Sequence, residues 1–271
     1  MSFEEDAFAM PQPIDRIVPK PHVYLSNEVL RDKPELALLV CKIFAIWARI
    51  EQQLTVLLVR VLGADYEPAF AIYSTLTAQH LQNRALDAAA KAVLSADDYQ
   101  IFNAAISVSQ SAQAPRNHLA HWSWGACKQR PDLLVLANPK MISARDIRVA
   151  NRVHLPPPFA DRLSPHEMGD LIQFDNSETL AYSKADLERA VRDLEEANIV
   201  IKNLVDYIDP AVTEGLFAHL PKWTMPRDQI RAEALLKLNE QRLFREALDR
   251  LRAGQKNTPQ RPRGSNSQEP A

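Results

Sequence analysis

The chain has 271 residues, enough for one large domain or one domain with attachments, and with 46% hydrophobic and 24% charged residues its composition is globular. Only 6 Gly accompany 19 Pro, which argues against phosphate-binding loops and repeated tight hairpins. The formal net charge of -2 provides no global basic field for a long polyanion, so any nucleic-acid contact has to be a local patch or involve a short substrate.

The first half of the chain predicts helices. Residues 1–33 contain scattered prolines and show weak periodicity, so we expect an extended arm with little helix. Apolar residues then recur at helical spacing over residues 34–62, and Gly63 supplies a stop, which predicts a long core helix. Ser95 can cap a later helix that carries two aspartates in its first turn. Helices are expected over residues 66–76, 78–94 and 95–111, followed by a new or kinked segment over 116–122 that Pro115 opens.

The middle of the chain predicts a small β-structure. Two apolar segments, 122–125 and 132–137, flank a polar turn and indicate a β-hairpin. A third strand is expected over residues 147–155, and the three prolines that follow would end it.

Helices are expected again toward the C-terminus. Capping patterns at Ser164 and Ser183 predict a short helix and a long one that ends near Ile208. A leucine-rich helix over residues 226–253 follows, and the polar, Pro-rich tail over 255–271 is expected to be disordered.

No targeting or membrane signal is evident. The N-terminal sequence MSFEEDAFAM is acidic and lacks the hydrophobic core of a signal peptide. The apolar run over residues 36–50 is too short for a bilayer span and contains Lys42 and Arg49. Cys41 and Cys127 have no CxxC spacing, and two buried reduced thiols are favoured over a lone disulfide. We therefore expect a cytoplasmic protein with no membrane contact.

The most informative segment is RNHLAHWSWG, residues 116–125. On a helix, Asn117 and His121 share a face, whereas Arg116 and His121 diverge by roughly 140°, so only the long arginine side chain can reach toward the imidazole. Arginine offers a planar charged fork to phosphate oxygens, and histidine transfers protons near neutral pH. If Pro115 opens the helix, the free amides of Arg116 and Asn117 add a weak anion site. The segment therefore suits a phosphodiester whose nucleophile is the 2′-OH of RNA, with no metal.

The pattern Arg-Asn-x-x-x-His with its Ala-His-Trp ending resembles the signature of the HEPN superfamily, and the resemblance covers about residues 34–125 and extends to the helix at Ser183. The resemblance implies a dimerising bundle of four or five helices in which two motifs face each other. Many such proteins are ribonucleases of toxin–antitoxin, abortive-infection or CRISPR-associated defence systems, and others are catalytically silent modules. It also implies that Arg116 binds phosphate, His121 transfers the proton and Asn117 orients both. An acidic residue often lies on the first helix of these domains, and Glu51 matches it in an apolar stretch where a carboxylate needs a partner such as Arg116.

Each of these residues also has a plainer interpretation. Arg116 and His121 could form a polar helix end, with the arginine at the surface and the histidine packed against a neighbouring tryptophan. Glu51 could form a structural salt bridge with no catalytic part. His118 and His121 are spaced as metal ligands could be, but no Cys, Asp or Glu follows at ligand spacing, so no metal site is expected.

We therefore predict an all-α, HEPN-like bundle of four to five helices with a small β-hairpin insertion. The expected function is that of a metal-independent RNA endonuclease, a homodimer without a cofactor, whose catalytic residues are Arg116, Asn117, His121 and Glu51. It would act as a toxin or phage-defence effector, with an antitoxin or regulatory protein as a further partner. The alternative is a catalytically silent dimeric module that binds a protein or nucleotide partner. The expected organisation is an arm over 1–33, a helical domain over 34–210 with its insertion near 122–155, C-terminal helices over 211–254 and the tail over 255–271.

Overall fold

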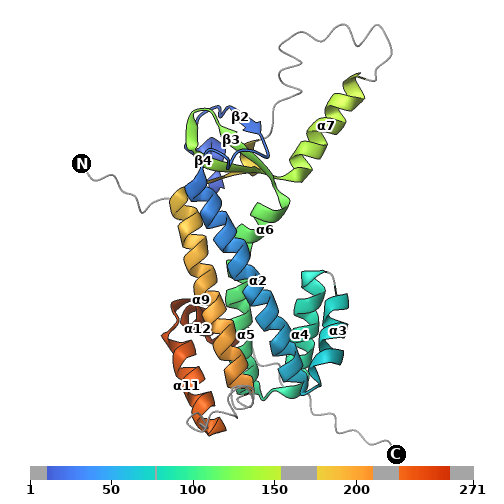
Figure 1. Cartoon of the computed structure of the whole chain (residues 1–271), viewed down its shortest axis with the longest axis vertical. Helices are drawn as coiled ribbons and strands as arrows, with labels where there is room; N and C mark the ends of the chain where they lie inside the picture. Colours follow the sequence, from blue (N-terminus) through green and yellow to red (C-terminus); the bar gives the residue numbers. More distant parts are fainter. Residues whose placement is uncertain (1–10, 77, 154–175, 210–225, 257–271) are drawn as a thin grey trace, which may run out of the picture. The chain divides into compact units, whose positions relative to one another are not determined.

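The computed structural model describes residues 11–76, 78–153, 176–209 and 226–256 (Figure 1). The elements are mostly helical and include one small antiparallel sheet, so the fold is mainly α, and the expectation of an all-α fold with only a hairpin is wrong in its strand content. The chain divides into two compact units, residues 1–49 with 111–195 and residues 50–110 with 196–271. Three helices contribute residues to both units: α2 (Pro34–Leu62), α5 (Ala96–Ala112) and α9 (Lys184–Ile208).

A five-stranded antiparallel sheet forms part of the first unit. The predicted hairpin is confirmed as its strands β3 and β4, which pair through Ser123 with Ala137 and through Trp124 with Leu136. The region expected as an extended arm supplies both edge strands, and β5 was not expected at all. Strands of two to four residues are too short to show a period in the sequence. In spatial order the strands are β1 (Gln12–Pro13), β5 (Thr179–Tyr182), β4 (Arg130–Ala137), β3 (Ser123–Cys127) and β2 (Val23–Leu25).

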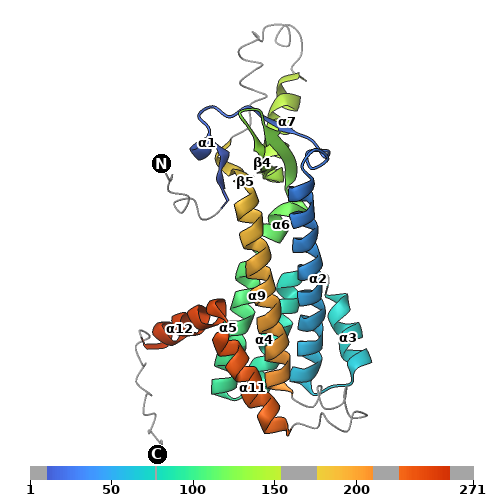
Figure 2. The same ribbon diagram turned by 60° about the vertical axis from the view of Figure 1, so that its left-hand side comes forward.

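The central strand β4 is buried on both faces over residues 133–137, and its sequence is accordingly a continuous apolar run. On one face, Leu133 and Val135 belong to a buried cluster that includes residues of α1 (Ile14–Ile17), the short helix beside the sheet in Figure 2. The alternate β4 residues point to the other face, where Tyr182 and Trp124 are their cross-strand neighbours. This second face carries the side chains that contact the motif helix.

Two further helices of the first unit flank the hairpin in sequence, one before it and one after it. The segment predicted to be kinked is α6 (Ala114–His121), and α7 (Pro139–Val153) follows β4. The third strand expected over 147–155 is wrong, because residues 147–153 belong to α7. Apolar residues there recur at spacings that fit a helix as well as a strand, and the sequence alone does not choose between them. The short helix expected from Ser164 lies outside the described residues.

Among the described residues of the second unit, all secondary-structure elements are helices. The long helix α2, the Ser95 cap of α5 and the end of α9 at Ile208 are confirmed, and the Asp98 amide donates to Ser95 Oγ at 3.2 Å. The single helix expected over 226–253 is two helices, because Gln241 is extended, with φ -77° and ψ 127° (Figure 2). The predicted tail beyond residue 256 lies outside the described residues. The remaining helices of the unit are α3 (Tyr66–Thr75), α4 (Gln79–Val93), α11 (Arg227–Glu240) and α12 (Arg242–Lys256).

Asp98, Tyr207 and Arg231, here called the Asp98 cluster, tie α5, α9 and α11 together. Tyr207 donates its hydroxyl to Asp98 at 2.7 Å, and the Arg231 guanidinium pairs with the same carboxylate while lying 4.3 Å from the centre of the Tyr207 ring. Burial by itself raises the pKa of Asp98, but hydrogen bonds from Tyr207 and Ser95 and the charge of Arg231 outweigh it and hold this pKa below its usual value. The cluster therefore links three helices with a carboxylate that favours its ionised form.

The structure also bears on the predicted state of the cysteines and on membrane-spanning helices. Cys41 and Cys127 are both free thiols, as predicted, although Cys41 is exposed rather than buried. Among the helices of the described residues, none combines the length and apolarity that crossing a bilayer requires.

Candidate active site

Helix α6 carries the Arg-Asn-x-x-x-His motif and follows α5 after a single residue, Gln113, whose backbone remains in the helical region. Pro115 lies in the first turn of α6, where the missing amide hydrogen and the bulk of the ring interrupt a continuous helix. The backbone amide of Asn117 donates to the Gln113 carbonyl at 3.1 Å. The anion site expected at the free amides of Arg116 and Asn117 is therefore wrong with respect to Asn117.

Arg116 is half-buried, and its guanidinium is oriented by neighbours on two elements. Its carbon Cζ lies 5.8 Å from the centre of the ring of Trp47, a fully buried residue of α2. Its Nη1 donates to Asn117 Oδ1 at 3.2 Å, and the same oxygen accepts from Gln113 Nε2 at 3.2 Å. These contacts reduce the number of positions open to the arginine side chain, and the role of Asn117 in orienting both Arg116 and His121 stays a prediction.

His121 is the last residue of α6, and its side chain is exposed. The plainer interpretation placed this histidine against a neighbouring tryptophan, but it is His118 whose ring packs against Trp122, with centroids 4.5 Å apart and ring planes tilted by 45°. At 100° per residue, Asn117 lies between Arg116 and His121 around the helix, so the three motif side chains leave α6 within an arc of about 140°. An exposed imidazole within the reach of a phosphodiester that the long arginine side chain binds can exchange protons with it.

Glu51, the fourth predicted catalytic residue, is on the long helix α2. Its side chain is exposed, so the expectation of an apolar environment around it is wrong. The helical period explains the error, because the apolar positions on either side of it in sequence face the other side of α2. Glu51 belongs to the second unit, whereas Arg116, Asn117 and His121 belong to the first, and the role of Glu51 in orienting Arg116 stays a prediction.

The opposite side of α6 contacts the sheet through His118 and Leu119. His118 Nδ1 lies 2.7 Å from the hydroxyl of Tyr182 on β5, and the indole Nε1 of Trp124 on β3 donates to the Leu119 carbonyl at 2.9 Å. Burial lowers the pKa of His118, while burial and the nearby charge of Asp186 raise that of Tyr182. Both shifts favour neutral forms, a phenol that can donate its proton to Nδ1 of an uncharged imidazole.

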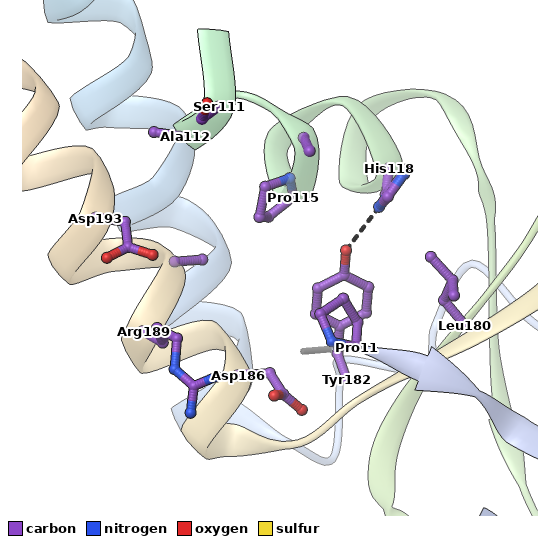
Figure 3. Close-up of a pocket in the computed structure, with 12 residues that line it drawn as sticks. Pro11, Ser111, Ala112, Pro115, His118, Leu180, Tyr182, Asp186, Arg189 and Asp193 are labelled. Carbon is purple, nitrogen blue, oxygen red and sulfur yellow. Dashed lines mark hydrogen bonds between the residues drawn. The ribbon is translucent and has the colours of Figure 1, made fainter. Parts of the chain in front are cut away.

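His118 and Tyr182 also line a pocket of about 270 Å³ between α6, β5 and α9, all within the first unit (Figure 3). Sequence reasoning considered His118 only as a partner of His121 in a metal site and did not consider Tyr182. The two residues are 64 positions apart, and no local pattern connects them. Only the pairing of β5 with β4 brings Tyr182 over α6.

Two further sources of functional information are a metal-binding cluster and similarity to known proteins. The described part of the chain contains no group of three or more His, Cys, Asp or Glu side chains able to hold a metal ion. Comparison of the sequence and structure with protein-family models, curated proteins and solved structures found no match. The arguments for function therefore depend on the residues themselves.

Proposed function

We propose that the protein is a metal-independent RNA endonuclease of the HEPN type that acts as a homodimer, in the manner of a toxin or defence effector. The observation that carries the proposal is the arrangement on α6. Asn117 accepts a hydrogen bond from the guanidinium of Arg116, and the exposed imidazole of His121 leaves the helix about 40° around from Asn117. A permanently charged fork and a proton-transfer group are what the cleavage of RNA through its own 2′-OH requires.

The proposed reaction uses the nucleophile that RNA contains. His121 accepts the proton of the 2′-OH as O2′ attacks phosphorus, and the bond between phosphorus and O5′ breaks. The departing O5′ takes up the proton that His121 returns, which leaves a 5′-hydroxyl and a 2′,3′-cyclic phosphate and restores the neutral imidazole. Arg116 stabilises the negative charge that grows on the non-bridging oxygens, and Asn117 holds its guanidinium. The second subunit of the dimer would supply a second copy of the motif facing the first.

The competing proposal is a catalytically silent dimeric module that binds a protein or nucleotide partner. One observation favours it: the Arg116 guanidinium lies over the buried ring of Trp47, so part of its charged surface is already in contact with protein. A phosphate-binding arginine has to keep part of its fork accessible to substrate. The half-burial of Arg116 therefore suits a structural role as well as a catalytic one.

Incubating the purified protein with labelled single-stranded RNA in excess chelator distinguishes the two. The nuclease proposal expects products that end in a cyclic phosphate, and a loss of roughly 100-fold or more in rate for His121→Ala, the usual scale of general acid–base catalysis. His80→Ala, which removes another exposed histidine, is the matched control and should cut at the wild-type rate. Cleavage that is absent in the wild type, or unchanged in His121→Ala, refutes the nuclease proposal and leaves the binding module. Wild-type toxicity on expression that both His121→Ala and Arg116→Ala abolish would support the same activity in cells.

A further inference from the structure

The pocket between α6, β5 and α9 has apolar walls and a polar side (Figure 3). Pro115 from α6 and Leu180 from β5 contribute apolar surface, and small alanine side chains leave the interior open. Its volume of about 270 Å³ is just below the range of about 300–1,000 Å³ typical of pockets for drug-sized ligands, so it suits a single small ring system.

The polar side of the pocket is one face of α9. Asp186, Arg189 and Asp193 follow one another at spacings of three and four residues, so they lie along the same side of the helix, and all three line the pocket. Asp186 Oδ2 accepts the cap hydrogen bonds from the amide and hydroxyl of Ser183, at 2.8 and 2.6 Å, which fixes this carboxylate. Two carboxylates against one guanidinium give this side a net negative charge.

We propose that this pocket binds a single heteroaromatic ring that carries an amino group, the chemistry of cytosine, adenine and guanine. The apolar walls accept the faces of such a ring, and the carboxylates on α9 accept hydrogen bonds from its exocyclic amino group. The excess of carboxylates disfavours a phosphate group. The hydrogen-bonded pair of His118 and Tyr182 closes the wall opposite α9 with neutral side chains, which can contact the ring without the cost of burying a charge.

This site is separate from the motif that carries the nuclease proposal. Around α6, Pro115 and His118 are 60° apart at 100° per residue and face the pocket, whereas His121 lies about 60° and Asn117 about 100° beyond His118, on the side away from Pro115. Neither Arg116 nor His121 lines the pocket. The inference therefore does not depend on RNA cleavage. A ligand in the pocket would contact α6 through its pocket-lining residues and not through the proposed catalytic side chains.

Binding of nucleosides to the full-length protein, measured by calorimetry, tests the proposal with matched pairs. Cytidine and uridine form one such pair, and guanosine and inosine, which differ only in the 2-amino group, form the other. We expect cytidine or guanosine to bind with a Kd at least about tenfold below that of uridine or inosine, respectively, because uridine and inosine lack the amino group that donates a hydrogen bond to a carboxylate of the pocket. Asp193→Asn should raise this Kd by about tenfold, while Glu195→Gln, an exposed change on the same helix, should leave it unaltered.

Several outcomes overturn the proposal. They are no binding of any of the four nucleosides, equal Kd values within both pairs, an unchanged Kd in Asp193→Asn, or equally tight binding of the aliphatic diamine putrescine. His121→Ala serves as a second control, since loss of cleavage there with intact nucleoside binding separates this inference from the nuclease proposal. An oligodeoxycytidine, which lacks the 2′-OH and cannot be cut, identifies the source of the base. Tighter binding of the oligomer than of cytidine assigns the site to a nucleic-acid strand, and the reverse assigns it to a free metabolite.

Discussion

Replacing Arg116 by alanine should destabilise the protein whether or not the arginine is catalytic. The guanidinium lies 5.8 Å from the centre of the Trp47 ring, a contact worth about 0.5–2 kcal/mol depending on its desolvation. Its hydrogen bond to Asn117 is long, at 3.2 Å, so its contribution is near the lower end of the roughly 1.5–3 kcal/mol typical of a charged group. Because the side chain is only half-buried, solvent screens both contacts, and we expect a total loss of about 2 kcal/mol in the free energy of unfolding.

A double-mutant cycle with Trp47→Leu isolates the contact between the two side chains. Trp47 is fully buried, so its replacement alone should reduce the free energy of unfolding by about 3 kcal/mol through lost packing. If the cation lies over the ring, the combined change should fall short of the sum of the single changes by about 1 kcal/mol. Urea unfolding followed by circular dichroism measures all four proteins. Arg192→Ala, which removes an exposed arginine of α9, is the matched control and should stay within about 0.5 kcal/mol of wild type.

A loss below about 0.5 kcal/mol for Arg116→Ala, with additive effects in the cycle, would refute this account of the contact. The result also decides how the cleavage assay is interpreted. If Arg116→Ala is destabilised as expected, a drop in its activity has to be compared at a temperature where the variant is fully folded. Arg116→Lys then becomes the informative variant, because it keeps the positive charge and removes the planar fork.

Two further predictions concern the packing of each unit. A Cβ atom added in Gly125→Ala would lie 2.6 Å from the backbone oxygen of Tyr24 on the paired strand, so we expect a loss of about 1–3 kcal/mol in urea unfolding. Gly254 is the matched control, because it lies in a helix and a Cβ atom added there has no atom within 4 Å. Gly254→Ala should therefore leave the free energy of unfolding unchanged or raise it by up to about 1 kcal/mol. Equal effects at the two glycines would contradict the strand pairing. In the Asp98 cluster, the lowered pKa means that the stabilisation is complete above the unfolded-state pKa of about 4 and is lost as the pH falls through the lower folded-state value. Thermal unfolding measured from about pH 2 to about pH 7 covers this titration, and the melting temperature of Asp98→Asn should depend less on pH than that of the wild type. Identical pH profiles of the two proteins would exclude the cluster as a source of acid sensitivity.

The helices were predictable because their signals are local. The apolar period of α2, the stop at Gly63 and the Ser95 and Ser183 caps each depend on residues within a few positions of one another, and the structure has helices with those limits. The hairpin was predictable for the same reason, since its two strands are adjacent in sequence. The position of the motif on one short helix was predictable from local spacing as well, while the chemistry of the motif stays a prediction.

What the tertiary structure decided is everything that depends on residues far apart in the chain. The edge strands β1 and β2 and the inner strand β5 are two to four residues long, and they are strands only because neighbouring backbone hydrogen-bonds to them. The pairing of Tyr182 with His118, and the pocket that they share with α9, follow from that sheet. The surroundings of Arg116 and the exposure of Glu51 were likewise outside the reach of spacing rules. A period in the sequence identifies which side of a helix is apolar, but which partner covers that side is determined by contacts across the chain.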